Sequence, residues 1–160
     1  MVDWETHLET LKEWKANGQI KYIGITTSHG RRHQALEQAL KTGAFDFVQF
    51  TYNVIDREAE KRLLPLAQEL GIAVIINRPF RGGDLFGLFN VKPLPDWSQE
   101  FDCNNWAQFF LKYVIAHPAV TCVIPATSKV KHLVDNMGAG RGRLSDAAMR
   151  ARMVAYFESL

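Results

Sequence analysis

The stretch from Thr121 to Asn136 carries residue types that are well suited to holding an anion. It begins with an apolar, β-prone run, breaks at Pro125, and passes through Thr127 and Ser128 into an amphipathic helical pattern. This order predicts a strand that leads into the N-terminus of a helix, where unpaired backbone N–H groups and the helix dipole favour negative charge. Either hydroxyl residue can also cap that helix. The two roles are compatible because both use the same N–H groups.

Arg81-Gly82-Gly83 is a second candidate for binding an anion. Glycine lets the backbone approach a ligand closely, and arginine pairs with phosphate through a fork of N–H donors. A solvated turn is an equally good interpretation of these three residues. They lie in a connection from about 77 to 105 that is rich in Gly, Pro and aromatic residues. Connections of that length inside a compact domain are often lids or binding loops.

Other residues with catalytic potential have plainer interpretations. His29 follows a predicted strand, where barrel enzymes gather their sites, but an exposed loop histidine accounts for it as well. Tyr52 has the chemistry of a proton donor, yet core packing also explains it. We interpret His117, which precedes Pro118, as structural. The glycine-rich run 138–142 lacks the preceding strand and the spacing of a dinucleotide fingerprint, and a loop is predicted there.

Four strand–helix units must position these candidates. Apolar runs predict strands at residues 20–26, 45–51, 72–76 and 121–124. Apolar stripes with helical spacing predict helices between them, which glycines and N-capping residues delimit. These helices cover about 3–17 (with Asp3 as the cap), a segment ending at Gly43, 56–71, 106–117, 128–137, and a last helix beginning at Ser145. Pro65 predicts a kink or a delayed start in the third helix.

Strands that alternate with helices predict a parallel sheet with right-handed crossovers. An open doubly wound sheet and part of a (β/α)8 barrel both fit this pattern. A complete barrel usually needs about 250 residues, so a chain of 160 residues with four strands is about half of one. We expect residues 1–160 to form a single domain, because that length suffices for one core.

Composition indicates an ordinary globular protein, with 47% hydrophobic and 22% charged residues. The net charge of +2 is too small to indicate nucleic-acid binding. No apolar run reaches the ~20 residues of a membrane span, and the N-terminal residues do not resemble a signal peptide. Cys103, in a predicted loop, and Cys122, in a predicted buried strand, lack metal-ligand spacing. We therefore expect no metal, and reduced thiols in a cytoplasmic protein.

Four stretches together resemble the aldo-keto reductases: Gly18–Thr26, Val48–Asn53, Leu63–Ile75 and His117–Pro125. The resemblance extends over nearly the whole chain in the order of the family. It corresponds to the C-terminal half of the family's barrel, the fifth to eighth strands with their helices. The resemblance therefore implies an α/β fold, a parallel (βα)4 half of a TIM-type (β/α)8 barrel with additional N- and C-terminal helices.

The resemblance also implies a cofactor, NADP(H), with NAD(H) as an alternative. At the nicotinamide carboxamide, Thr26 and Thr27 stand where the family usually has Ser-Asn, and Gln49 matches a glutamine. Asn77 takes the place of the tyrosine on which the nicotinamide ring stacks. The neighbouring Arg78 then resembles the Arg-Pro variant that some bacterial relatives carry at this place.

The remaining matches lie along the rest of the dinucleotide. The pyrophosphate loop is matched by Phe80, Arg81, Gly82 and Gly83. The site of the adenosine 2′-phosphate is matched by Ala126, Thr127, Ser128, Lys129 and His132, and that of the adenine by Asp135 and Asn136. Since the family's Lys-Ser and downstream Arg are replaced here, Lys129 or Lys131 would supply the positive charge.

The catalytic Asp, Tyr, Lys and His of the family belong to earlier strands, so the resemblance implies no catalytic residue in this chain. Hydride transfer to a carbonyl needs a positioned acid, and we therefore expect an oxidoreductase half that is incomplete alone. Two alternatives remain. Two or more copies could self-associate through their open strand edges and have a structural or binding role. A partner chain could instead carry the N-terminal half-barrel and complete an active carbonyl reductase.

Overall fold

The computed structural model describes residues 4–89 and 92–160, and the structural statements below refer to those residues. Its centre is one sheet of four strands, β1 (Gly24–Thr26), β2 (Phe47–Thr51), β3 (Ala73–Asn77) and β4 (Cys122–Val123). The strands are all parallel and lie in the order β1-β2-β3-β4. This topology confirms the predicted α/β class with four strand–helix units.

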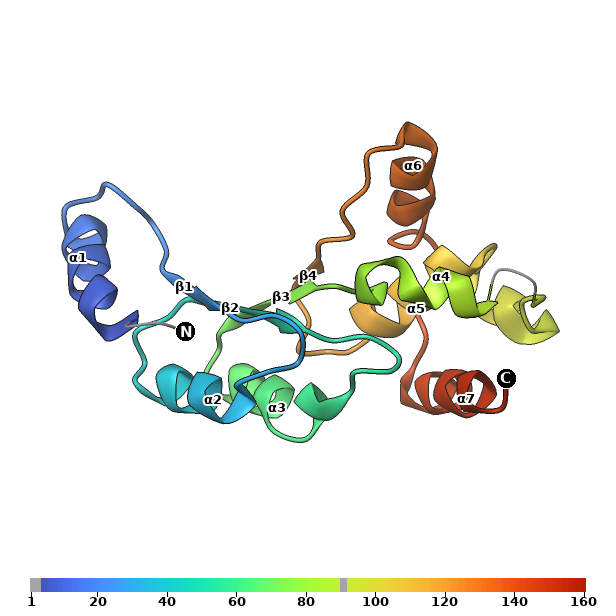
Figure 1. Ribbon diagram of the computed structural model, residues 1–160, viewed down its shortest axis with the longest axis horizontal. Helices are drawn as coiled ribbons and strands as arrows, with labels where there is room; N and C mark the ends of the chain where they lie inside the picture. Colours follow the sequence, from blue (N-terminus) through green and yellow to red (C-terminus); the bar gives the residue numbers. More distant parts are fainter. Residues whose placement is uncertain (1–3, 90–91) are drawn as a thin grey trace.

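One face of the sheet forms the core. Val48 and Phe50 of β2, with Val74 and Ile76 of β3, are completely buried. Figure 1 shows α2 (His33–Lys41) and α3 (Leu63–Glu69) on one side of the sheet, and none of the labelled helices directly over the other. The alternate residues of each strand, such as Thr26 and Gln49, remain accessible on that second face.

The other helices lie close to their predicted positions: α1 (Trp4–Ala16), α5 (Trp106–Ile115), α6 (Val130–Gly138) and α7 (Ala147–Glu158). Asp146 caps α7, because its carboxylate accepts a hydrogen bond of 2.7 Å from the Met149 N–H. The predicted cap Asp3 lies outside the described residues. Pro65 falls in the first turn of α3, where a missing N–H costs nothing. The delayed start is therefore correct, and a 3-10 turn, η1 (Glu58–Glu60), occupies the preceding segment.

Two sequence predictions are wrong, one about the length of the edge strands and one about the long connection. β1 and β4 are much shorter than the runs 20–26 and 121–124, since both are edge strands with a partner on one side only. The connection 77–105 is not irregular throughout: it contains the turn η2 (Arg81–Gly83), the helix α4 (Asp84–Phe89) and the turn η3 (Asp96–Phe101). Burial of Leu85 and Phe101 in the core explains why this segment is structured.

The cysteines exchange their predicted environments. Cys103 is buried, and burial raises the pKa of its thiol to about 11. Cys122 is exposed, because it lies on the uncovered face of the edge strand β4. The sequence alone suggested a buried strand at this position.

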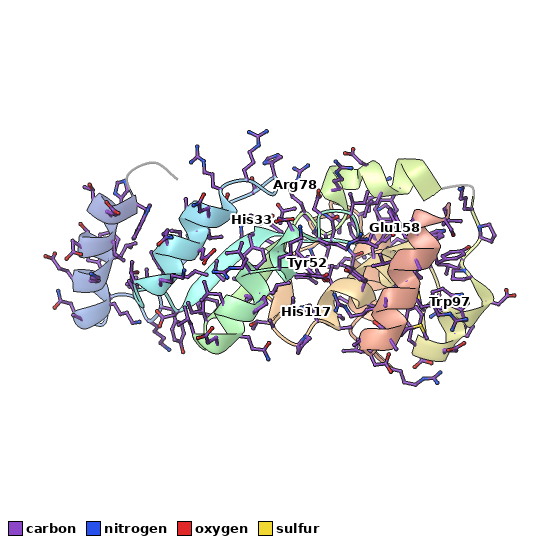
Figure 2. All side chains as sticks on the ribbon, turned by 90° about the horizontal axis from the view of Figure 1, so that it is seen from below. His33, Tyr52, Arg78, Trp97, His117 and Glu158 are labelled. Carbon is purple, nitrogen blue, oxygen red and sulfur yellow. The ribbon has the colours of Figure 1, made fainter. Side chains whose placement is uncertain are left out.

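A polar cluster joins α7 to the rest of the core. One carboxylate oxygen of Glu60 accepts hydrogen bonds from the Tyr113 hydroxyl at 2.9 Å, from the Arg150 guanidinium at 2.6 Å, and from the Tyr52 hydroxyl. The Arg150 guanidinium also lies 4.7 Å from the centre of the Tyr113 ring. Figure 2 shows Tyr52 within the molecule, between Arg78 and His117. Tyr52 is thus fully enclosed, and burial raises its pKa.

We predict that Glu60→Gln destabilises the fold by about 2 kcal/mol, since it leaves the Arg150 charge without a counter-ion. The Arg150 side chain is only 14% exposed. Burial would raise the pKa of Glu60, but hydrogen bonds from Tyr52, Tyr113 and Arg150 outweigh it and hold that pKa below its ordinary value of 4.5. The stabilisation is therefore present above that value and is lost as pH falls through the lower, folded pKa.

Urea denaturation of the parent chain and of the Glu60→Gln variant, at about pH 7 and about pH 3, measures the difference in their free energies of unfolding. Glu69→Gln, at the end of α3, is the matched control and should change little. Equal midpoints for the Glu60 variant and the parent at neutral pH would contradict the assignment.

Candidate functional site

A set of hydrogen bonds at one edge of the sheet fixes the carboxyl ends of three strands. The Asn77 side chain donates to the Thr27 carbonyl at 2.8 Å and accepts from the Thr51 hydroxyl at 2.7 Å. The Thr51 hydroxyl in turn accepts from the His29 N–H at 2.9 Å. Asn77 is 7% exposed, so these bonds are largely shielded from water. The strand ends are thereby tied together as a rigid base.

Thr26 and Gln49 stand side by side on this base. They are register partners in β1 and β2, and the Gln49 amide donates to the Thr26 hydroxyl at 2.9 Å. Both lie on the uncovered face of the sheet. They line a first hollow of about 480 Å³, together with Thr27, Ser28, His29, Arg31, Arg32 and Asn77. An amide beside a hydroxyl offers both donors and acceptors to a small polar group.

The turn after β3 is built from left-handed residues. Arg78 (φ 50°), Arg81 (φ 53°), Gly82 (φ 76°) and Gly83 (φ 106°) all have positive φ. A Cβ atom at Gly82 would lie 3.0 Å from the Arg78 guanidinium, so glycine allows this close approach. Arg78, Gly82 and Gly83 line a second hollow of about 360 Å³, opposite Ala126 and its neighbours.

A third hollow, of about 500 Å³, adjoins the second. Phe80, Phe86 and Trp106 supply aromatic surface, and the segment from β4 into α6 supplies polar groups. Those from the predicted set are Ala126, Thr127, His132, Asp135 and Asn136. Because Phe80, Phe86 and Ala126 line both the second and the third hollow, the two are continuous.

The start of α6 differs from the capping prediction. Lys129 is the N-cap residue and makes no side-chain capping bond. The Thr127 hydroxyl instead accepts from the Lys129 N–H at 3.2 Å, in the turn before the helix. Neither Thr127 nor Ser128 therefore caps α6. Ser128, Lys129 and Arg81 line none of the three hollows, whereas the other predicted site residues line at least one.

Several lining residues were missed at the sequence level. Ser28, Arg31 and Arg32 enter the first hollow beside His29, which the sequence had offered as a candidate, and their place directly after a predicted strand was the available signal. Phe86 and Trp106 enter the third hollow, and nothing in the spacing of these aromatic residues indicated it. Within residues 4–89 and 92–160, no group of three or more His, Cys, Asp or Glu is placed to hold a metal ion. No helix in those ranges is long and apolar enough to cross a membrane.

A buried lysine, also missed, holds the loop behind α6. Lys112 of α5 is completely buried, and its ammonium donates to the carbonyls of Arg141 at 2.7 Å and Arg143 at 2.8 Å. Burial lowers the pKa of Lys112. The Arg143 guanidinium pairs with Asp102 at 3.0 Å. The glycine-rich run 138–142 is thus the end of α6 and an anchored loop, with no strand leading into it.

Comparison with known proteins gives a consistent family. A model described as the aldo/keto reductase family matches residues 2–153. An uncharacterised oxidoreductase of Bacillus subtilis, YqkF, is 26% identical over 85% of this chain and 50% of its own length. The NADH-specific methylglyoxal reductase of Escherichia coli is 35% identical over 53% of this chain and 25% of its own length. The chain spans about half the length of the first curated relatives it matches.

Solved structures show the same fold. An aldo/keto reductase from Klebsiella pneumoniae, in complex with NADP and acetate, matches with a TM-score of 0.73 and 24% identity, over 92% of this chain and 53% of its own. The holo form of an aldo-keto reductase from Bacillus halodurans matches with a TM-score of 0.72 and 21% identity, over 96% and 56%. The predicted TIM-type arrangement is thereby confirmed for the part present here.

We predict that Asn77→Ala lowers the free energy of unfolding by about 2 kcal/mol, because it removes two shielded hydrogen bonds between strand ends. Chemical denaturation measures the change. Asn104→Ala, at an exposed position between η3 and α5, is the matched control and should have little effect. If both variants lose the same stability, the bonds of Asn77 do not fix the strand ends.

Proposed function

The chain belongs to the aldo/keto reductase family, and we propose that it is the part of such an oxidoreductase that binds a nicotinamide dinucleotide. One observation carries this proposal: three hollows follow one another along the carboxyl ends of the strands, with polar groups at one end and an aromatic chamber at the other. Ligands of parallel α/β folds bind at that edge of the sheet.

The chemistry of the lining residues fits each part of a dinucleotide. The paired Thr26 hydroxyl and Gln49 amide suit the nicotinamide carboxamide, which needs both a donor and an acceptor. The buried Asn77 would support them from below. The glycine turn at Gly82 and Gly83 leaves room for a pyrophosphate close to the backbone. When bound, the cofactor supplies a hydride donor or acceptor.

The third hollow fits an adenosine. Phe80, Phe86 and Trp106 offer apolar surface to a purine, while Asp135 and Asn136 can bond its polar edge. His132 lines the same chamber, and Lys129 and Lys131 lie nearby on the exposed start of α6. The two lysines favour NADP(H), with its additional phosphate, over NAD(H). Relatives with either cofactor are known: a Klebsiella structure contains NADPH, and the E. coli relative is named NADH-specific.

We propose that reductase chemistry needs groups beyond these residues. Reduction of a carbonyl produces an alkoxide that an acid must protonate. Among the described residues, neither a tyrosine nor a lysine lines any of the three hollows. Tyr52 points into the Glu60 cluster beneath the sheet, with its hydroxyl fully engaged. The chain by itself would thus bind cofactor without turning over a carbonyl substrate.

A second proposal, that another copy of the chain completes the barrel, follows from surfaces that are left uncovered. Val130, Leu133, Val134 and Met137 form one apolar stripe on α6, and they are 77%, 52%, 65% and 64% exposed. An amphipathic helix normally turns such a stripe inward. β1 and β4 also pair on one side only, and open strand edges favour association.

Two copies offer matching surfaces for this closure. Figure 1 places α1 beside β1 at one end of the sheet and α6 beyond β4 at the other. Glu5 and Glu13 of α1 and Lys131 of α6 make no ion pair among the described residues. If β4 of each copy meets β1 of the other, two four-stranded sheets give eight strands, and opposite charges face each other at both junctions. The competing occupant is a chain that carries the N-terminal half-barrel.

We predict that the chain binds NADPH and that the binding quenches the fluorescence of Trp106 in the third hollow. Trp106→Phe should abolish the quenching but retain the heat of binding by calorimetry. The other three tryptophans of the chain then serve as an internal control. Absence of binding at millimolar cofactor would contradict the proposal.

The same titration addresses the choice of cofactor. Lys129→Ala with Lys131→Ala should weaken NADPH binding by about fivefold, as expected for an exposed ion pair worth about 1 kcal/mol, and should leave NADH binding unchanged. Lys21→Ala, before β1, is the matched control. Equal losses for both cofactors would remove the assigned role of these lysines.

We predict a dimer of about twice the chain mass of 18.2 kDa by light scattering. Leu133→Glu with Val134→Glu should give a monomer, because charge would enter the apolar stripe. Leu70→Glu, at an exposed apolar position after α3, should remain dimeric. A monomeric parent chain would contradict self-association, and stable capture of a chain with the other half-barrel would favour the competing occupant.

A further inference from the structure

The arginines of this chain fall into two groups. Six form an ion pair with a carboxylate: Arg57, Arg62, Arg81, Arg143, Arg150 and Arg152. Arg31, Arg32, Arg78 and Arg141 form none with any residue in 4–89 or 92–160. Three of these four lie just beyond the carboxyl ends of β1 and β3. The arginines without an ion pair are therefore concentrated at the edge of the sheet that carries the hollows.

The first hollow has no carboxylate to balance its charge. Arg31, Arg32 and His29 line it, and none of its other lining residues is acidic. A hollow of about 410 Å³ near the start of α7 shows the contrast, because Arg143 and Arg152 there are accompanied by Glu100 and Asp146. The first turn of α2 also lacks an acidic residue and a side-chain cap. The dipole of this nine-residue helix therefore adds to the positive potential of the arginines.

The loop that carries Arg31 and Arg32 is held in place. The Thr27 hydroxyl donates to the Arg31 carbonyl at 3.1 Å, and the His29 N–H donates to the Thr51 hydroxyl at 2.9 Å. His29 and Arg32 have φ values of 64° and 60°, which cost on the order of 1 kcal/mol each for residues other than glycine. The side chains of the loop thus start from a fixed backbone that adjoins the Thr26–Gln49 pair.

We propose that Arg31 and Arg32 bind the anionic group of the substrate. The substrate class is a small carbonyl compound that carries a carboxylate or a phosphate ester. Guanidinium groups match both anions through paired N–H donors, and the volume of about 480 Å³ accommodates a small ligand. This inference rests on the proposed function, because the carbonyl must lie beside the nicotinamide that Thr26 and Gln49 would hold.

The phosphates of the cofactor do not account for this charge. They are assigned to the turn at Gly82 and Gly83, which lines the second hollow, and to the start of α6, which follows Thr127 of the third hollow. Arg31 and Arg32 line neither of these. An anion in the first hollow therefore belongs to a second ligand, and it should bind together with the cofactor rather than in competition with it.

Calorimetric titration of the chain with oxalate, an unreactive dicarboxylate, tests the proposal in the absence of any cofactor. We expect one site with a millimolar dissociation constant, and no binding of neutral oxamide. Arg31→Gln with Arg32→Gln should weaken oxalate binding at least tenfold. Arg141→Gln is the matched control, because Arg141 is the unpaired arginine away from the hollow. Methyl phosphate in a parallel titration shows whether the site prefers a phosphate ester over a carboxylate.

Repeating the oxalate titration with saturating NADPH separates the two ligands. An unchanged or tighter dissociation constant supports the proposal, and competition would overturn it by assigning the arginines to the cofactor. Absence of oxalate and methyl phosphate binding, or equal weakening by Arg141→Gln, would overturn it as well. NADPH binding itself is measured separately by Trp106 fluorescence, so a failure of the cofactor proposal is distinguishable. Circular dichroism of each variant confirms that it is folded.

Discussion

The hydrogen bonds that join Thr51, Asn77 and Thr27 are the constraint on which the site depends. Parallel strands bring their carboxyl ends to one edge, but they do not by themselves set how far each strand extends. The shielded Asn77 amide sets it here, because it bonds to the strand end on β2 and to the residue after β1. The hollows rest on this edge: Gln49 and Thr26 lie two register positions before the Thr51–Asn77 pair, and the turn at Arg78 begins one residue after it.

Polar groups divide by function between the packed interior and the carboxyl edge of the sheet. In the interior, charged groups have partners: Glu60 accepts three hydrogen bonds, and the buried Lys112 donates to two carbonyls that anchor a loop. Removal of one partner from such a cluster leaves a buried charge, so these groups serve stability and specificity of packing. At the carboxyl edge, Arg31, Arg32 and Arg78 have no such partners. Because these three arginines line hollows, they are the cations with which the proposed ligands would pair.

Periodicity predicted the alternation of strands and helices, because buried apolar residues must recur at the spacing of each element. It did not predict the short β4, since Thr121–Ile124 is apolar enough for a strand but has a partner on one side only. The helix α4 was missed because Gly82, Gly83 and Gly87 obscure its pattern. Most of the predicted site residues were named from a resemblance, whereas Arg31 and Arg32 were not, because arginines directly after a strand are equally typical of a solvated loop. That they lack a carboxylate partner, unlike six other arginines, appears only in the structure.

The uncovered face of the sheet connects assembly with binding. Parallel sheets are stable when both faces are covered, and here the first hollow opens on the face that lacks a cover. Any partner that closes the barrel therefore also narrows the hollow around Thr26 and Gln49. By linkage, a ligand that binds better to the closed form strengthens closure by the same factor that closure strengthens its binding. Under the proposed function, a half-barrel with an open face would bind its ligand weakly alone, and closure by a partner would increase the affinity of the site that it completes.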